Sequence, residues 1–134
     1  MVTRKLIIPP GMENIHSLYH YAPGILVGDV LYVSGQVGRD AALNVVEGAE
    51  AQFTQAFENV GKVLTAAGAG FDDVIELETW FADSMADLKT FLAVKDRFFT
   101  NRYPTWTGFA VTGFSMPGIL VEIKVKAILG LAES

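Results

Sequence analysis

Residues 24–36 read GILVGDVLYVSGQ, and this stretch decides the fold that the sequence predicts. Two short apolar runs, 24–27 and 30–34, flank the dipeptide Gly28-Asp29. Apolar runs separated by a two-residue Gly-Asp turn are typical of a β-hairpin. We therefore expect two antiparallel strands here, around which the rest of the chain builds its sheet.

Two helices are expected after the hairpin. Residues 47–67 form the clearer one, because their apolar side chains recur at spacings of three and four and so share one face, and a glycine-rich segment then stops the helix. Residues 88–100 continue a second helical face. Ser84, with Asp87 three residues later, resembles a capping box at the start of this second helix.

Runs of branched and aromatic residues predict the remaining strands. In the last of them, Val121 and Ile123 alternate with Glu122 and Lys124, so that apolar and charged side chains point to opposite faces. Residues 13–23 lie between prolines and are expected to form a loop rather than a regular helix. The other expected strands are residues 5–8, 73–81, 105–111 and 120–129, and the other expected loops are residues 35–43 and 112–118.

This order of strands and helices predicts an α+β fold with one mixed β-sheet and two helices on one face. The length of 134 residues suits one domain that covers residues 1–134. A chain of this length buries enough surface to fold without a disulfide bond or a structural metal.

The hairpin strands are apolar on both faces. Leu31 and Val33 point one way, and Val30 and Tyr32 point the other way. Two helices can cover only one face of the sheet, so the face that carries Tyr32 is expected to be open.

The strand after the first helix has the same character. We expect Ile75 and Leu77 to lie opposite Val74 and Trp80. An open face that carries Trp80, with Trp106 as a further candidate, forms a large apolar patch of a kind that monomers rarely expose. We therefore expect the open faces to pack on one another in a closed symmetric oligomer, the alternative being that long loops cover them.

Composition excludes several classes of function. The formal net charge is -5 and no stretch concentrates Lys and Arg, which disfavours a nucleic-acid partner. No apolar run approaches the roughly 20 residues that span a bilayer, so no membrane association is expected. The chain has no cysteine, which excludes thiolate catalysis and cysteine-ligated zinc and fits a reducing, cytoplasmic location.

The common catalytic motifs are missing from the sequence. The only histidines, His16 and His20, would share a face with Glu13 as a third metal ligand if their segment were helical. Because the segment is expected to be a loop, no metal site is expected. Ser34 lies outside any arrangement typical of a serine nucleophile, and no glycine-rich phosphate loop opens a helix.

Three side chains remain as candidates for chemistry or binding. Glu122 lies on the charged face of the last strand, where a carboxylate at an interface can move protons, or where it is simply solvated beside Lys124. Tyr21 is either a hydroxyl donor or a packed loop aromatic. Trp106 is either a stacking surface for a ligand or a residue buried in an interface.

Residues 24–36 resemble the signature segment of the Rid/YjgF family, the reactive intermediate deaminases that are also labelled endoribonuclease L-PSP or translation-inhibitor proteins. The Ser-Gly-Gln ending at residues 34–36, the Tyr103-Pro104 step and the last strand around Glu122 line up with the family in order. Each motif alone is weak, but their order and spacing over nearly the whole chain are specific.

The resemblance implies a chorismate-mutase-like fold and a homotrimer with ligand clefts between its subunits. It also implies hydrolysis of reactive enamines and imines to a keto acid and ammonia, without a cofactor. Tyr21 matches the family's loop tyrosine, Ser34 and Gly35 match the backbone of its site, and Glu122 is the candidate for the strand glutamate that activates water. In a second alignment of the last strand, Lys124 takes the place of that glutamate.

The chain departs from the family at the residue that holds the substrate carboxylate. Two residues after Pro104, where the family has an arginine, stands Trp106, and Leu92 and Gly108 replace the family's asparagine and cysteine. A tryptophan cannot form a charged fork with a carboxylate. The resemblance then implies a more apolar cleft in which Trp106 and Thr107 contact the substrate.

Arg39 or Arg102 could reach the cleft and take the place of the missing arginine. The alternative for each of them is an arginine on the protein surface. Two functions also stay open. The first is hydrolysis of an imine, an enamine or a related small molecule with altered specificity. The alternative is a non-catalytic trimer that binds a small molecule or another protein. The acidic charge balance argues against the ribonuclease label.

Overall fold

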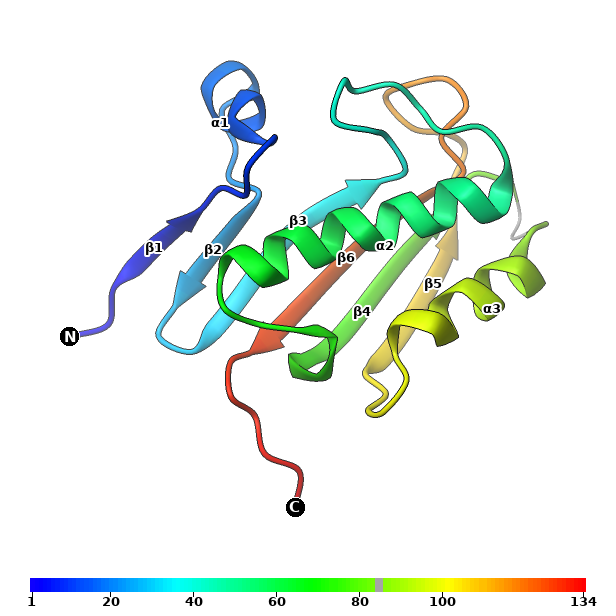
Figure 1. Ribbon diagram of the computed structural model, residues 1–134. Coiled ribbons are helices and arrows are strands. Elements are labelled where there is room, and N and C mark those ends of the chain that lie inside the picture. Colours follow the sequence, from blue (N-terminus) through cyan, green and yellow to red (C-terminus); the bar gives the residue numbers. More distant parts are fainter. Residues whose placement is uncertain (84–85) are drawn as a thin grey trace.

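The computed structural model describes residues 1–83 and 86–134 and contains a six-stranded sheet with the strand order β1-β2-β3-β6-β4-β5 (Figure 1). β4 and β5 pair in parallel, and the other neighbouring strands are antiparallel, so the sheet is mixed, as predicted. The strands are β1 (Arg4–Ile7), β2 (Gly24–Val27), β3 (Val30–Val37), β4 (Val74–Phe81), β5 (Thr105–Ala110) and β6 (Val121–Ile128).

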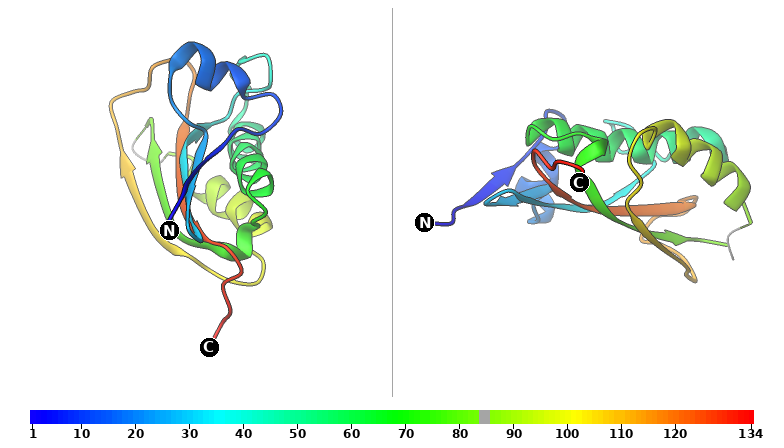
Figure 2. Two further views of the ribbon diagram at one scale, coloured as in Figure 1. Left: turned by 90° about the vertical axis from the view of Figure 1, so that its left-hand side faces the viewer. Right: turned by 90° about the horizontal axis from the view of Figure 1, so that it is seen from below.

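Both long helices, α2 (Ala49–Ala66) and α3 (Leu88–Phe98), lie on the same face of the sheet (Figure 2). Their apolar faces meet the inward face of the sheet, and the ring of Phe57 packs between α2 and α3 at 5.5 Å from that of Phe91 and 5.1 Å from that of Phe98. The predicted α+β class, with one sheet and two helices on one face, is confirmed.

The hairpin of residues 24–36 forms as predicted. Val27 pairs with Val30 across a turn in which Gly28 has a φ of 60°, a conformation that favours glycine. Leu31 is fully buried beneath the helices, whereas Tyr32 is 47 % exposed on the opposite face. The other face of the hairpin is therefore open within the single chain.

The expectation of a loop over residues 13–23 is wrong, because α1 (Glu13–Tyr19) is a helix. The flanking prolines lie outside it, Glu13 stands in its first turn, and buried Ile15 anchors it to the core. His20 has a left-handed φ of 58° and ends the helix, so Glu13, His16 and His20 do not all belong to one regular helix. Among the residues that the structure describes, no three ligand side chains gather in a metal site. A short 3-10 turn, η1 (Phe71–Asp73), precedes β4.

Two strands contain β-bulges that the sequence analysis did not predict. β3 continues to Val37, past its predicted end, with a bulge between Val33 and Gln36 opposite β6. A second bulge, between Val74 and Glu76, places Val74 on the buried side together with Leu77 rather than opposite to it. An inserted residue in a strand reverses the face of the side chains beyond it, which explains the second error.

The capping box expected from Ser84 lies outside the described residues. Asp87, its expected partner, stands directly before α3 and makes no side-chain capping hydrogen bond. In the part of the chain that the structure covers, no helix combines the length and apolar character that crossing a bilayer demands.

Candidate functional site

The side chain of Glu122 lies against the backbone of Gly35. Glu122 is the second residue of β6, and Gly35 lies in the bulged part of β3 beside it, so that a Cβ atom added to Gly35 would stand 2.5 Å from Oε2 and 2.8 Å from Cδ of Glu122. Real Cβ atoms do not come so close to their neighbours, so a side chain at residue 35 would require the Glu122 side chain to move from this position. Lys124 points to the same side of β6 but stands exposed further along it, so Glu122 rather than Lys124 reaches Gly35.

Ser34 ties the segment that carries Tyr21 to this bulge. Its hydroxyl donates a hydrogen bond to the carbonyl oxygen of Ala22 at 2.6 Å, and its backbone N–H donates to the carbonyl oxygen of Pro23 at 2.9 Å. Since its hydroxyl proton is engaged in this way, Ser34 holds the backbone of the site. Tyr21, which precedes these two residues and is 42 % exposed, lines the same pocket as Gly35.

Tyr21 and Gly35 line a pocket of about 60 Å³ between α1, the end of β3 and α2. Two cationic side chains, Arg39 and Lys62, line it as well. Asn59 of α2 holds the backbone at the end of β3 in place. Its side-chain NH₂ group donates hydrogen bonds to the carbonyl oxygens of Val37 and Arg39 at 2.9 Å each. The pocket thus combines a rigid backbone with two cationic side chains and the carboxylate of Asp40.

Asn59 and Lys62 were not among the predicted site residues. The sequence held one signal for Asn59: it lies, with Gln52 seven residues earlier, on the otherwise apolar face of α2, and both are buried. A buried amide needs partners, and Gln52 finds them in the carbonyl oxygens of Val46 and Gly118 and the N–H of Leu120. Lys62 gives no comparable signal.

Trp106 lies on the helix-covered face of the sheet, so its expected place on the open face is wrong. Its Nε1–H donates to the Oγ1 atom of buried Thr79 at 2.9 Å, its ring lies 5.8 Å from that of Phe91, and the Nζ atom of Lys95 stands 5.4 Å from its centroid. The cause is the register of the parallel pair, in which Trp106 is the partner of inward-facing Leu77.

Thr107 points the other way and is exposed. It is the partner of Glu78, and β4 separates it from β6, so the single chain does not bring Thr107 to Glu122. Trp80 lies on the open face as expected and is the cross-strand partner of Glu122 on β6. On its other side, Trp80 pairs with Phe109 of β5. The two predicted substrate contacts on β5, Trp106 and Thr107, therefore lie apart from Gly35 and Glu122.

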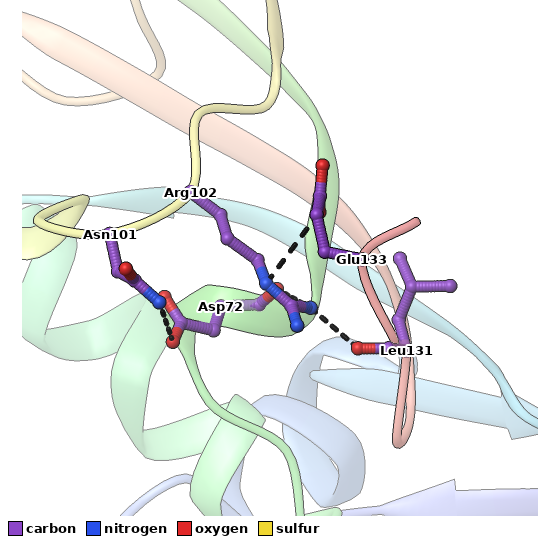
Figure 3. Close-up of polar contacts among 5 residues, drawn as sticks. All are labelled: Asp72, Asn101, Arg102, Leu131 and Glu133. Carbon is purple, nitrogen blue, oxygen red and sulfur yellow. Dashed lines mark hydrogen bonds and ion pairs between the residues drawn. The ribbon is translucent and has the colours of Figure 1, made fainter.

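Arg102 lies at the opposite end of the sheet, where β4 begins (Figure 3). Its Nη1 atom donates to the carbonyl oxygens of Leu131 at 2.5 Å and Asp72 at 3.3 Å, and its Nε atom lies 3.7 Å from Oε2 of Glu133. These contacts hold the C-terminal segment, and within the chain they keep Arg102 away from Glu122.

One carboxyl group at the rim of the pocket, that of Glu13, has a lowered pKa. Glu13 accepts hydrogen bonds from the backbone N–H of Gly11, the shorter at 2.9 Å, and these lower the pKa of Glu13 below its ordinary value. Gly11 lines the pocket, so this bond shapes its outer edge.

The fold and the site define a class of protein. The model of the Endoribonuclease L-PSP family matches residues 12–129, and the chain belongs to this family, which is also called Rid/YjgF. The resemblance in the sequence is thus confirmed at the level of the family.

Two curated relatives illustrate the range of the match. The RutC family protein YjgH of Escherichia coli strain K12 is 34 % identical over 128 residues, which cover 95 % of this chain and 96 % of the relative. The human 2-iminobutanoate/2-iminopropanoate deaminase is 30 % identical over 112 residues, which cover 82 % of this chain and 80 % of the relative.

Solved structures agree with the fold. A structure of protein YJGH aligns with a TM-score of 0.85 at 33 % identity and covers 93 % of this chain and 95 % of its own. RidA from the Antarctic bacterium Psychrobacter sp. PAMC 21119 aligns with a TM-score of 0.78 at 28 % identity, covering 84 % of this chain and 91 % of its own.

Proposed function

We propose that this protein hydrolyses a small imine or enamine to a carbonyl compound and ammonia at the site formed by Tyr21, Gly35 and Glu122. The observation that carries the proposal is the carboxylate of Glu122 held against the backbone of Gly35. The name of the human relative as an imine deaminase supports the reaction type. Glu122 is the catalytic residue of the proposal, and Tyr21 the second polar group.

The chemistry needs one group that takes a proton from water and returns it. Water adds its oxygen to the carbon of the protonated imine while the carboxylate of Glu122 accepts a proton, which gives a neutral carbinolamine. Glu122 then returns this proton to the nitrogen, the carbon–nitrogen bond breaks and the carbon becomes a carbonyl, while the hydroxyl proton leaves with ammonia as ammonium. An enamine first takes a proton on its carbon to become the imine. Water is the only co-reactant, and the proposal includes no cofactor.

We propose further that the active form is a homotrimer whose clefts lie between subunits. The face of the sheet without helices supports this, because Tyr32 is 47 % exposed and Phe109 is 51 % exposed on it. A second subunit would bring its own β5 or loops to Glu122. The cytoplasmic location remains a prediction from the absence of cysteine.

A non-catalytic trimer that binds a small molecule is the second candidate function. The packing of Trp106 beneath α3 favours it, because the residue at the expected substrate-holding position is used for the core. In this case Glu122 would contact a ligand without turning it over.

The test compares hydrolysis of 2-iminobutanoate and of a neutral aromatic imine by the wild type, by Glu122→Gln and by a matched control, Glu76→Gln. Glu76 lies on β4 toward the other end of the sheet. We expect Glu122→Gln to lower kcat by roughly 10²- to 10⁴-fold and Glu76→Gln to leave it unchanged. No acceleration of either imine by the wild type, with ligand affinity kept in Glu122→Gln, would support the binding trimer instead.

A further inference from the structure

Glu122 stands where the pairing of β6 with β3 ends. Its partner Val37 is the last residue of β3, and on the side of β4 the pair of Val121 with Phe81 alone lies beyond it among the described residues. The ends of paired strands open at a smaller cost in free energy than their centres. Strand pairing therefore holds the backbone of Glu122 less firmly than that of a residue in the middle of the sheet.

The side chain of Gln52 holds the chain just before this point. Its Oε1 atom accepts a hydrogen bond from the backbone N–H of Leu120 at 2.6 Å, two residues before Glu122. Its Nε2 atom donates to the carbonyl oxygens of Gly118 at 2.8 Å and of Val46 at 3.1 Å. Two of these three hydrogen bonds thus go to the segment that leads into β6.

The anchor itself is rigid. Gln52 is 1 % exposed, and Gly38 lies so close to it that a Cβ atom added to Gly38 would overlap the Cγ atom and the carbonyl oxygen of Gln52. A buried amide whose hydrogen bonds are all satisfied keeps one orientation. Leu120 is therefore tied to a fixed point of α2.

A second buried amide of α2 holds the opposing strand. Asn59, seven residues after Gln52, donates to the carbonyl oxygen of Val37 at 2.9 Å, and Val37 is the partner of Glu122. α2 thus fixes both strand ends that meet at Glu122. The bond from Gln52 to Leu120 is the one of the two that acts on β6 itself, the strand that carries the carboxylate.

One residue separates Leu120 from Glu122. This residue, Val121, is fully buried and pairs with Phe81 of β4. Because a densely packed interior transmits strain, a shift of Leu120 moves the next residues of the extended chain with it. The carboxylate of Glu122, which lies against the backbone of Gly35, would then leave its place.

We infer that Gln52 is a positioning residue of the proposed active site, because its hydrogen bond to Leu120 sets the place of the Glu122 carboxylate. The inference rests on the proposed function, in which Glu122 accepts the proton from water. Gln52 itself lies on the helix-covered side of the sheet and contacts neither the substrate nor the reacting atoms. Its loss should lower the rate of the chemical step, since a displacement of about 1 Å in an active site lowers a rate on the order of a hundredfold.

The experiment compares three variants of the full chain with the wild type. Gln52→Met keeps the length of the side chain and removes all three hydrogen bonds. Gln52→Glu is the conservative variant, because a carboxyl oxygen can still accept from the N–H of Leu120, while the donors to the carbonyl oxygens are reduced. Val63→Ala is the matched control: Val63 is fully buried on the same helix, and its truncation leaves a cavity but keeps the bonds of Gln52.

Three measurements are made on each variant. Steady-state kinetics with 2-iminobutanoate and with the neutral aromatic imine give kcat and KM. NMR follows the amide signal of Gly35 and the carboxyl-carbon signal of Glu122, which do not depend on turnover. Urea unfolding establishes that each variant is folded and how much stability it has lost.

We expect Gln52→Met to lower kcat roughly tenfold to a hundredfold, to leave KM within about threefold and to shift both NMR signals. Gln52→Glu should recover most of the lost kcat. Val63→Ala should lose stability while kcat and both signals stay as in the wild type. This contrast separates positioning of the carboxylate from a contribution of Gln52 to stability alone.

The outcomes keep the inference apart from the proposed function. With imine hydrolysis observed, the inference is wrong if Gln52→Met has the kcat of the wild type, if Gln52→Glu loses as much kcat as Gln52→Met, or if Val63→Ala loses as much. If the wild type hydrolyses neither imine, the hydrolase proposal fails and the NMR signals decide. The anchoring of Glu122 then stands if Gln52→Met moves them and Val63→Ala does not, and it falls otherwise.

One measurement on the wild type covers the case in which Gln52→Met does not fold. Hydrogen exchange at the amide of Leu120 reports directly on its bond to Gln52. Slow exchange at this amide supports the anchor, whereas exchange as fast as in an unfolded chain overturns the inference.

Discussion

The carboxylate of Glu122 lies so close to Gly35 that a Cβ atom on residue 35 would stand 2.5 Å from Oε2. The missing side chain of Gly35 in β3 thus leaves room for the carboxylate of Glu122 on the neighbouring strand β6. Gly35 lies in the bulged part of β3, where a glycine permits this close approach.

Gly35→Ala should therefore displace the carboxylate of Glu122. We expect the proposed activity to fall at least tenfold, whereas the free energy of unfolding should change by less than about 1 kcal/mol, because the new Cβ meets only the flexible side chain of Glu122, which can rotate away. Steady-state kinetics and urea unfolding measure the two effects. Gly113→Ala is the matched control, because a Cβ at Gly113 meets nothing within 4 Å, and it should change neither value.

Ser34→Ala should loosen the segment that carries Tyr21. The loss of the hydrogen bond to the carbonyl oxygen of Ala22 should lower the free energy of unfolding by about 1 kcal/mol. Hydrogen exchange should speed up at residues 20–23 and at the N–H of Ser34. Ser34→Thr keeps the hydroxyl and should retain most of the protection; unchanged exchange in Ser34→Ala would contradict the tethering role.

Trp106→Phe should lower stability rather than ligand binding. Thr79 is fully buried, and removing the indole N–H takes away its hydrogen bond, which should lower the free energy of unfolding by about 1–3 kcal/mol. Thr107→Ala, at the exposed neighbour, should stay within about 0.5 kcal/mol of the wild type. A loss of ligand affinity without a loss of stability in Trp106→Phe would restore the substrate-binding role that the sequence predicted.

Arg102→Ala should release the C-terminal segment without touching the proposed chemistry. Its bonds to the carbonyl oxygens of Leu131 and Asp72 join the chain end to the start of β4 (Figure 3). We expect a loss of about 1 kcal/mol in the free energy of unfolding and faster proteolysis at residues 131–134. Lys89→Ala on α3, away from this cluster, is the control; a fall in kcat in Arg102→Ala alone would place Arg102 in the active site of the assembly.

The sequence predicted the parts of this fold that depend on pattern. The hairpin turn at Gly28 and the apolar face of α2 are local signals, and both were found where the residues placed them. The fold class followed from their order. Gly35 lies against the side chain of Glu122 and lines a pocket together with Tyr21, and the catalytic role of these residues stays a prediction.

The sequence could not predict the features of the sheet that depend on how neighbouring strands pair. The side on which Trp106 lies follows from its register with Leu77, and nothing in residues 105–110 fixes that register. The bulge after Val74 likewise exists only relative to β6. α1 was missed because its seven residues are too few for a clear period and only Ile15 among them is buried.

The hydrogen bond between Glu13 and Gly11 should weaken as the pH falls. The pKa of Glu13 is lower in the folded chain than in the unfolded chain, so its stabilising contribution is complete above the unfolded value and is lost as the pH falls through the folded value. An acid titration followed by NMR should show the amide of Gly11 shifting in this acidic range, together with faster exchange in α1. Glu13→Gln should abolish the titration of that amide, whereas Glu50→Gln on α2 should leave it intact. A Gly11 amide that does not respond to pH in the wild type would contradict the bond, and with it the fixed outer edge of the pocket.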